Sequence, residues 1–124
     1  MRNLTLTACE AEVMNVVWSR NSVTVQDVVD AIPRDLAYTT VMTTLKILED
    51  KGFIVRGRKI GRAYSYKALV SCESASSRTV NEMANRYFDG SVKSMVLSLI
   101  RTQQITAEDL AELRDAIVSL EQSK

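Results

Sequence analysis

Apolar residues in the first part of the chain recur at the three- and four-residue spacing of amphipathic helices. The first such pattern begins at Thr7, which has Glu10 three residues later and therefore matches a capping box. The second begins at Thr24, with Asp27 at the same spacing, and Pro33 ends it because proline cannot continue a helix. The pattern predicts two short, well-capped helices.

A third helical pattern covers residues 38–51 and is followed by Gly52, which suits a helix C-terminus. One face is apolar and consists of Val41, Leu45 and Leu48. The opposite face consists of Thr39, Met42, Thr43 and Lys46. The helix is rich in threonine, although β-branched residues are poor helix formers. Short hydroxyl side chains that approach DNA bases would explain this composition, and a helix stabilised by tertiary packing would tolerate it equally well.

Two short strands are predicted after this helix, over residues 53–58 and 63–67, with a turn at 59–62 in which Gly61 can adopt a positive φ. Residues 51–67 contain six basic residues and no acidic one. Residues 1–50 contain four basic and seven acidic residues, and residues 68–124 contain six and eight. A chain of net charge +1 is therefore basic in one place only.

Three helices followed by a hairpin form the plan of a winged helix-turn-helix domain, which we expect over residues 1–70. In that geometry the third helix enters the major groove and the hairpin, or wing, lies along the DNA backbone. We expect Arg34 and Tyr38 to contact phosphates, and Thr40 and Thr44 to lie at the groove edge or against the second helix. The residues expected to contact DNA are Arg34, Tyr38, Thr39, Thr40, Met42, Thr43, Thr44, Lys46, Arg56, Arg58, Lys59 and Arg62.

Residues 71–124 predict three further helices, which gives a mainly α fold with one small β-hairpin. Ser91 and the pair Thr106 and Asp109 are placed to cap the last two. Each helix has an apolar stripe, so we expect a C-terminal dimerisation domain; folding back onto the N-terminal helices is the alternative. The residues expected at the dimer interface are Val80, Met83, Tyr87, Phe88, Met95, Leu99, Leu110, Leu113, Ile117 and Leu120.

Composition argues against several other classes of protein. The 124 residues include no histidine, and no glycine-rich phosphate loop or metal-ligand spacing is present, so we expect no enzyme, cofactor or metal site. No apolar run approaches the roughly 18 residues of a membrane span, and no secretion signal precedes Thr7, so we expect a cytoplasmic protein without membrane insertion. Cys9 and Cys72 suit small buried thiols, with a redox or metal sensor as the alternative.

Several segments together resemble the penicillinase-repressor (BlaI/MecI/CopY) family of bacterial winged-helix regulators. The resemblance covers nearly the whole chain and depends on the order and spacing of these segments. They are Leu6-Thr7, residues 11–14, Val17-Trp18, residues 38–41 with Thr43 and Leu48, Lys51-Gly52, residues 64–66, residues 87–91 and residues 109–114.

The resemblance implies a homodimeric repressor of a resistance or metal-handling operon, bound to a palindromic operator in double-stranded DNA. It also implies a membrane metalloprotease sensor as a partner. Two features depart from the family. The paired C-x-C motifs of the copper-sensing branch are absent from residues 120–124, and Ser98-Leu99 stands where the β-lactam branch is cleaved at an Asn-Phe bond. A protein-interaction module remains an alternative function, although the third helix offers threonines rather than large apolar anchors.

Overall fold

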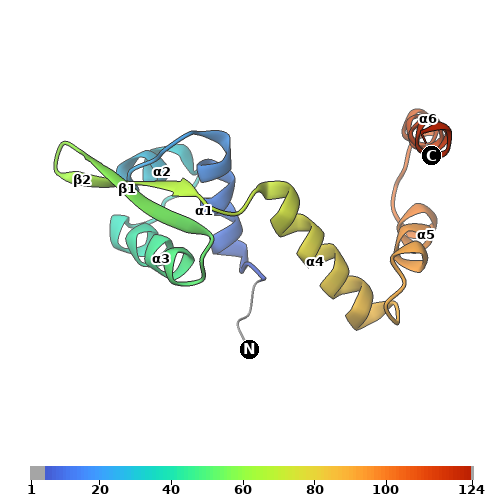
Figure 1. The fold of residues 1–124 in the computed structure, drawn as a ribbon, viewed down its shortest axis with the longest axis horizontal. Helices are drawn as coiled ribbons and strands as arrows, with labels where there is room; N and C mark the ends of the chain where they lie inside the picture. Colours follow the sequence, from blue (N-terminus) through green and yellow to red (C-terminus); the bar gives the residue numbers. More distant parts are fainter. Residues whose placement is uncertain (1–4, 124) are drawn as a thin grey trace. The chain divides into compact units, whose positions relative to one another are not determined.

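The computed structural model describes residues 5–123, which form six helices and one antiparallel hairpin (Figure 1). The described elements are α1 (Ala8–Ser19), α2 (Val25–Ala31), α3 (Tyr38–Asp50), β1 (Ile54–Ile60), β2 (Ala63–Ala68), α4 (Cys72–Tyr87), α5 (Val92–Thr102) and α6 (Ala107–Gln122). The chain divides into two compact units between Val80 and Asn81, within α4. The functional division at residue 70 stays a prediction.

The predicted helix starts are confirmed. Thr7 accepts a hydrogen bond from the backbone N–H of Glu10, and the Glu10 carboxylate accepts one from the N–H of Thr7 at 2.9 Å. Thr24 and Asp27 form the same reciprocal pair at α2. Further along the chain, Ser91 caps α5 and Thr106 with Asp109 caps α6. These bonds satisfy backbone N–H groups that a helix leaves without partners at its start.

A single core fills the first unit between α1, α2, α3 and the hairpin. Its buried members are Val13, Met14, Val17, Val23, Val25, Val28, Ile32, Val41, Leu45, Leu48, Phe53, Ile54 and Ala75. Because Ala75 lies in α4, the first turn of that helix packs on this core. Trp18 in α1 donates a hydrogen bond from its indole Nε1 to the carbonyl oxygen of Val70 at 2.8 Å, which fixes the segment leading into α4.

The hairpin is longer than the sequence predicted, since β1 runs to Ile60 and β2 begins at Ala63. The turn therefore contains two residues rather than four, and Gly61 takes the expected positive φ of 66°. The hairpin is fixed to the helices through Val23, just before α2, whose backbone exchanges two hydrogen bonds with Tyr66 at 2.9 and 2.7 Å. This pairing places the wing beside α2 and α3 in the first unit.

The second unit contains the end of α4 together with α5 and α6. The chain leaves α4 through Asp89 and Gly90, both at positive φ. Ala84 and Met95 are buried, whereas α6 has no buried residue. No helix in residues 5–123 has the length and apolar character needed to cross a membrane.

Candidate nucleic-acid interface

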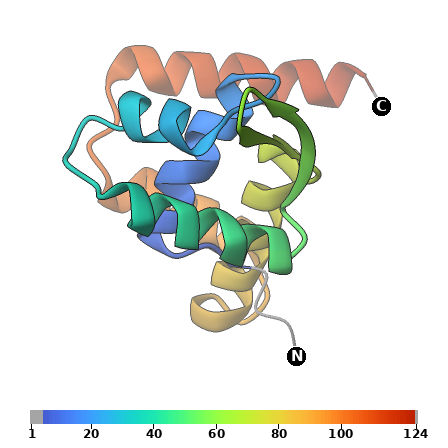
Figure 2. The ribbon, with the colours of Figure 1, turned by 90° about the vertical axis from the view of Figure 1, so that its left-hand side faces the viewer.

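Helix α3 has one buried and one exposed face, as its sequence pattern predicts. The buried side chains are Val41, Leu45 and Leu48, together with Thr44. The exposed side chains include Tyr38, Thr39, Thr40, Met42, Thr43 and Lys46. Figure 2 looks onto this helix, with α2 and the hairpin beside it. The side chains expected to contact bases are therefore all exposed to solvent.

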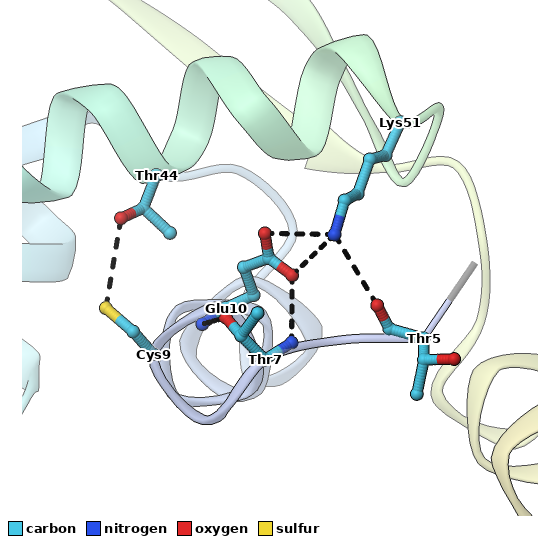
Figure 3. Close-up of polar contacts among 6 residues, drawn as sticks. All are labelled: Thr5, Thr7, Cys9, Glu10, Thr44 and Lys51. Atoms are coloured by element: carbon cyan, nitrogen blue, oxygen red, sulfur yellow. Dashed lines mark hydrogen bonds and ion pairs between the residues drawn. The ribbon is translucent and has the colours of Figure 1, made fainter. Parts of the chain in front are cut away.

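Thr44 is buried, unlike the neighbouring threonines of α3, and we correct its assignment. Only 7% of its surface is exposed, and its hydroxyl donates to the carbonyl oxygen of Thr40 at 2.8 Å. The same hydroxyl lies 3.8 Å from the Cys9 sulfur of α1 (Figure 3). Thr44 therefore lies in the contact between α3 and α1, and its burial removes it from the set of side chains expected to contact DNA.

Arg34, in the connection between α2 and α3, is engaged by a carboxylate of α1. Its Nε and Nη2 donate to the two Glu12 carboxylate oxygens at 2.9 and 2.6 Å. These hydrogen bonds lower the pKa of Glu12 and raise the pKa of Arg34. The Arg34 and Glu12 side chains are 52% and 34% exposed, so solvent screens the charges of this pair.

The wing carries exposed cations around one aromatic ring. The Arg56 guanidinium carbon and the Lys59 ammonium nitrogen lie 4.7 and 4.9 Å from the centre of the Tyr64 ring. Arg56 also contacts the Glu49 carboxylate of α3 at 3.4 Å, and this hydrogen bond raises the pKa of Arg56. Arg58 and Arg62 are exposed on the same hairpin. The wing thus presents a positive surface that begins next to the end of α3.

Lys51 is counted among the six basic residues, but the structure assigns it a different role. Its ammonium group donates to both Glu10 carboxylate oxygens, at 2.8 and 3.1 Å, and approaches the Thr5 carbonyl oxygen at 3.5 Å (Figure 3). Burial would raise the pKa of Glu10, but hydrogen bonds from Lys51 and Thr7 and the Lys51 charge lower it below its usual value. Lys51 therefore connects the end of α3 to the start of α1.

The two thiols are separate features of the first unit. The expectation of two buried thiols is wrong for Cys72, which is exposed at the start of α4. Cys9 is partly buried, with its sulfur against Thr44, and both cysteines are free thiols. Within residues 5–123, no group of three or more acidic or cysteine side chains is arranged to bind a metal ion.

The three-helix core, the exposed face of α3 and the cationic hairpin define a winged-helix regulator. The chain matches the model of the penicillinase repressor family over residues 6–119 and belongs to that family, as the sequence resemblance predicted. It is therefore a DNA-binding transcriptional repressor in its general function.

Relatives support this assignment along most of the chain. The transcriptional regulator BlaI of Mycobacterium tuberculosis is 33% identical over 116 residues, covering 90% of this chain and 82% of the relative. The methicillin resistance regulatory protein MecI of Mammaliicoccus sciuri is 26% identical over 114 residues, covering 90% and 92%.

Solved structures show the same fold at lower sequence identity. The reduced form of MarR from E. coli has a TM-score of 0.51 at 16% identity, covering 93% of this chain and 77% of that chain. The transcriptional regulator SlyA has a TM-score of 0.50 at 18% identity, covering 97% and 77%. Both are winged-helix regulators, so the predicted fold class is confirmed.

Proposed function

We propose that this chain is a homodimeric repressor that binds a palindromic operator, with α3 in the major groove and the wing on the DNA backbone. The observation that carries the proposal is the exposed polar face of α3 beside the cationic hairpin. A DNA-bound dimer would block the promoter by occupying it. The names of its relatives favour a resistance operon as the target. The family resemblance offers a metal-handling operon as a second target and a membrane metalloprotease sensor as a partner, and we propose a cytoplasmic location.

In this proposal the exposed side chains of α3 distinguish bases. Thr39, Thr43 and Lys46 offer hydrogen-bonding groups to base edges, and Thr40 lies nearer the phosphates at the groove edge. Met42 is 46% exposed although it is apolar. Its side chain is suited to contact the methyl group of thymine, which is an apolar feature of the major groove.

The basic residues provide the sequence-independent part of the affinity. Arg58, Lys59 and Arg62 lie on the wing and would contact the flanking phosphates, joined by Arg56. Arg34 and Tyr38 flank the start of α3, where the positive end of the helix dipole also favours a phosphate. Arg34 would leave Glu12 on binding, because one anion replaces another.

The dimer contact is proposed to lie on the exposed apolar side chains of the three C-terminal helices. Such side chains favour an interaction surface because their exposure to water is unfavourable. Met95 is 6% exposed, so we leave it out of this surface. The remaining candidates are the exposed Val80, Met83, Tyr87, Leu99, Leu110, Leu113, Ile117 and Leu120, together with Phe88, which is partly buried. In a dimer the two α3 helices would lie about 34 Å apart, or a multiple of that distance, to reach successive major grooves.

The proposal is tested by measuring DNA affinity as a function of salt concentration. The probe is a fluorescent duplex enriched from random DNA by the full chain. Arg62→Ala and Arg58→Ala should each weaken binding to every sequence and reduce the slope of log affinity against log salt by about one unit. The control is Arg114→Ala, a substitution on α6. Unchanged slopes in both wing variants would contradict a contact between the wing and the phosphates. If unlabelled competitor DNA of unrelated sequence abolishes all binding to the probe, a protein-interaction module is favoured instead.

A further inference from the structure

The wing contains an irregularity that controls where its cations point. Arg56 pairs with Tyr66, and the next pair in the ladder is Lys59 with Tyr64. Gly57 and Arg58 on β1 therefore lie opposite Ser65 alone on β2. Two residues opposite one is the definition of a β-bulge.

The bulge changes which face of the hairpin carries each cation. In a regular strand, residues three positions apart point to opposite faces, so Arg56 and Lys59 would be separated. The extra residue returns Lys59 to the face of Arg56. The observed distances agree, because both cations lie within 5 Å of the centre of the same Tyr64 ring.

Ser65 closes the bulge from the opposite strand. Its side chain is buried, with 5% exposed, and its hydroxyl donates to the Arg58 carbonyl oxygen at 2.6 Å. Gly57 provides the space, because a β-carbon at that position would lie 3.2 Å from the Ser65 hydroxyl oxygen. The bulge is thus built from a small residue on β1 and a hydrogen bond from β2.

We propose that Tyr64, which follows the bulge in the ladder as the partner of Lys59, is a positioning residue. Its ring gathers Arg56 and Lys59 into one site for DNA phosphates. The inference rests on the proposed function, since it requires that the wing contacts DNA. Two like charges repel each other, and the electron-rich face of an aromatic ring attracts both. The ring therefore arranges the two cations before DNA arrives, which reduces the side-chain entropy lost on binding.

The test compares two substitutions at one position in the full chain. Tyr64→Phe keeps the ring, and Tyr64→Leu removes it while keeping an apolar side chain. On the enriched duplex, Tyr64→Leu should weaken binding roughly fivefold or more, because two long side chains must then be ordered on binding at a cost of about 0.5 kcal/mol or more each. Tyr64→Phe should stay within about twofold of the unmodified chain, because the ring face attracts the cations.

A double-mutant cycle distinguishes positioning from a general effect on the wing. Lys59→Ala should weaken binding less in the Tyr64→Leu background than alone, because its positioning is already lost. Arg62→Ala is the matched control, since Arg62 lies in the hairpin turn, and among residues 5–123 the cation–π contacts with the Tyr64 ring come from Arg56 and Lys59. Its effect should be the same in both backgrounds. Proton NMR adds a structural measurement: the Lys59 side-chain protons should lose their ring-current shift in Tyr64→Leu.

Two results would overturn the inference and leave the proposed function intact. One is binding by Tyr64→Leu within twofold of the unmodified chain. The other is equal coupling of Tyr64 to Lys59 and to Arg62, which would make the ring a general support of the hairpin. If Lys59→Ala and Arg62→Ala change neither affinity nor salt slope, the wing does not contact DNA, and the proposed function of the wing fails together with the inference.

Discussion

Replacing Lys51 with methionine should destabilise the first unit without changing any residue of the proposed DNA-contacting surface. The substitution removes the ammonium group that bonds both oxygens of the Glu10 carboxylate. The Lys51 and Glu10 side chains are only 23% and 7% exposed. Lys51→Met therefore leaves a buried carboxylate that retains its capping bond from Thr7 but has lost its positive partner.

The size of the effect follows from burial. Breaking a fully buried ion pair by removing one partner costs about 3–5 kcal/mol. Lys51 is partly solvated, so we expect a loss of about 2–3 kcal/mol here. The double variant Glu10→Gln/Lys51→Met removes the stranded charge, and glutamine still serves a capping box. It should recover to within about 1 kcal/mol of the unmodified chain.

The dependence on pH provides a second signature. In the unmodified chain the pKa of Glu10 is lowered, so its contribution to stability is present at neutral pH. That contribution is lost as the pH falls below the usual value near 4.5. In Lys51→Met, burial should instead raise the pKa of Glu10, so protonation stabilises the variant. The difference in free energy of unfolding should therefore be largest near neutral pH and shrink below about pH 5.

Urea unfolding followed by tryptophan fluorescence measures this difference. The chain has one tryptophan, Trp18, which lies in the first unit and donates a hydrogen bond to the Val70 carbonyl oxygen. A loss below about 0.5 kcal/mol in Lys51→Met, or a double variant no more stable than Lys51→Met, would refute the role assigned to the pair. A difference that grows as the pH falls would refute it as well.

Two further predictions concern the recognition surface and the dimer. Glu49→Gln should tighten DNA binding a few-fold at low salt, with the gain fading at high salt, because Arg56 loses a competing carboxylate; fluorescence anisotropy measures both. Leu113→Asp should convert a dimer into a monomer in sedimentation equilibrium, because it places a charge in the proposed apolar contact, whereas Glu112→Gln should leave the dimer intact. A dimeric Leu113→Asp chain would place the contact elsewhere.

The local features of the fold were predictable from the sequence because they depend on nearby residues. The capping pair of Thr7 and Glu10 needs only a three-residue spacing, and the two faces of α3 need only helical periodicity. The positive φ at Gly61 was likewise indicated by residue type.

Contacts between distant segments were not predictable in this way. Lys51 was grouped with the wing by charge, but its partner Glu10 lies 41 residues earlier in the chain. Thr44 differs from Thr43 only in its direction from the helix, which the packing of α1 decides. The bulge had one local signal, since Gly57 within a predicted strand is a known sign of a bulge. Its partner Ser65 gave none.

The division of roles between α3 and the wing is the central claim, and a complete set of single-base operator variants tests it most directly. Relative affinities are measured for Thr43→Ala and Arg62→Ala, with Thr44→Val as the control for a buried hydroxyl. We predict that Thr43→Ala loses discrimination at one position of each half-site, by about 1–3 kcal/mol. Arg62→Ala should weaken binding to all variants equally, and Thr44→Val should change neither. A uniform loss in Thr43→Ala, or a position-specific loss in Arg62→Ala, would contradict the account.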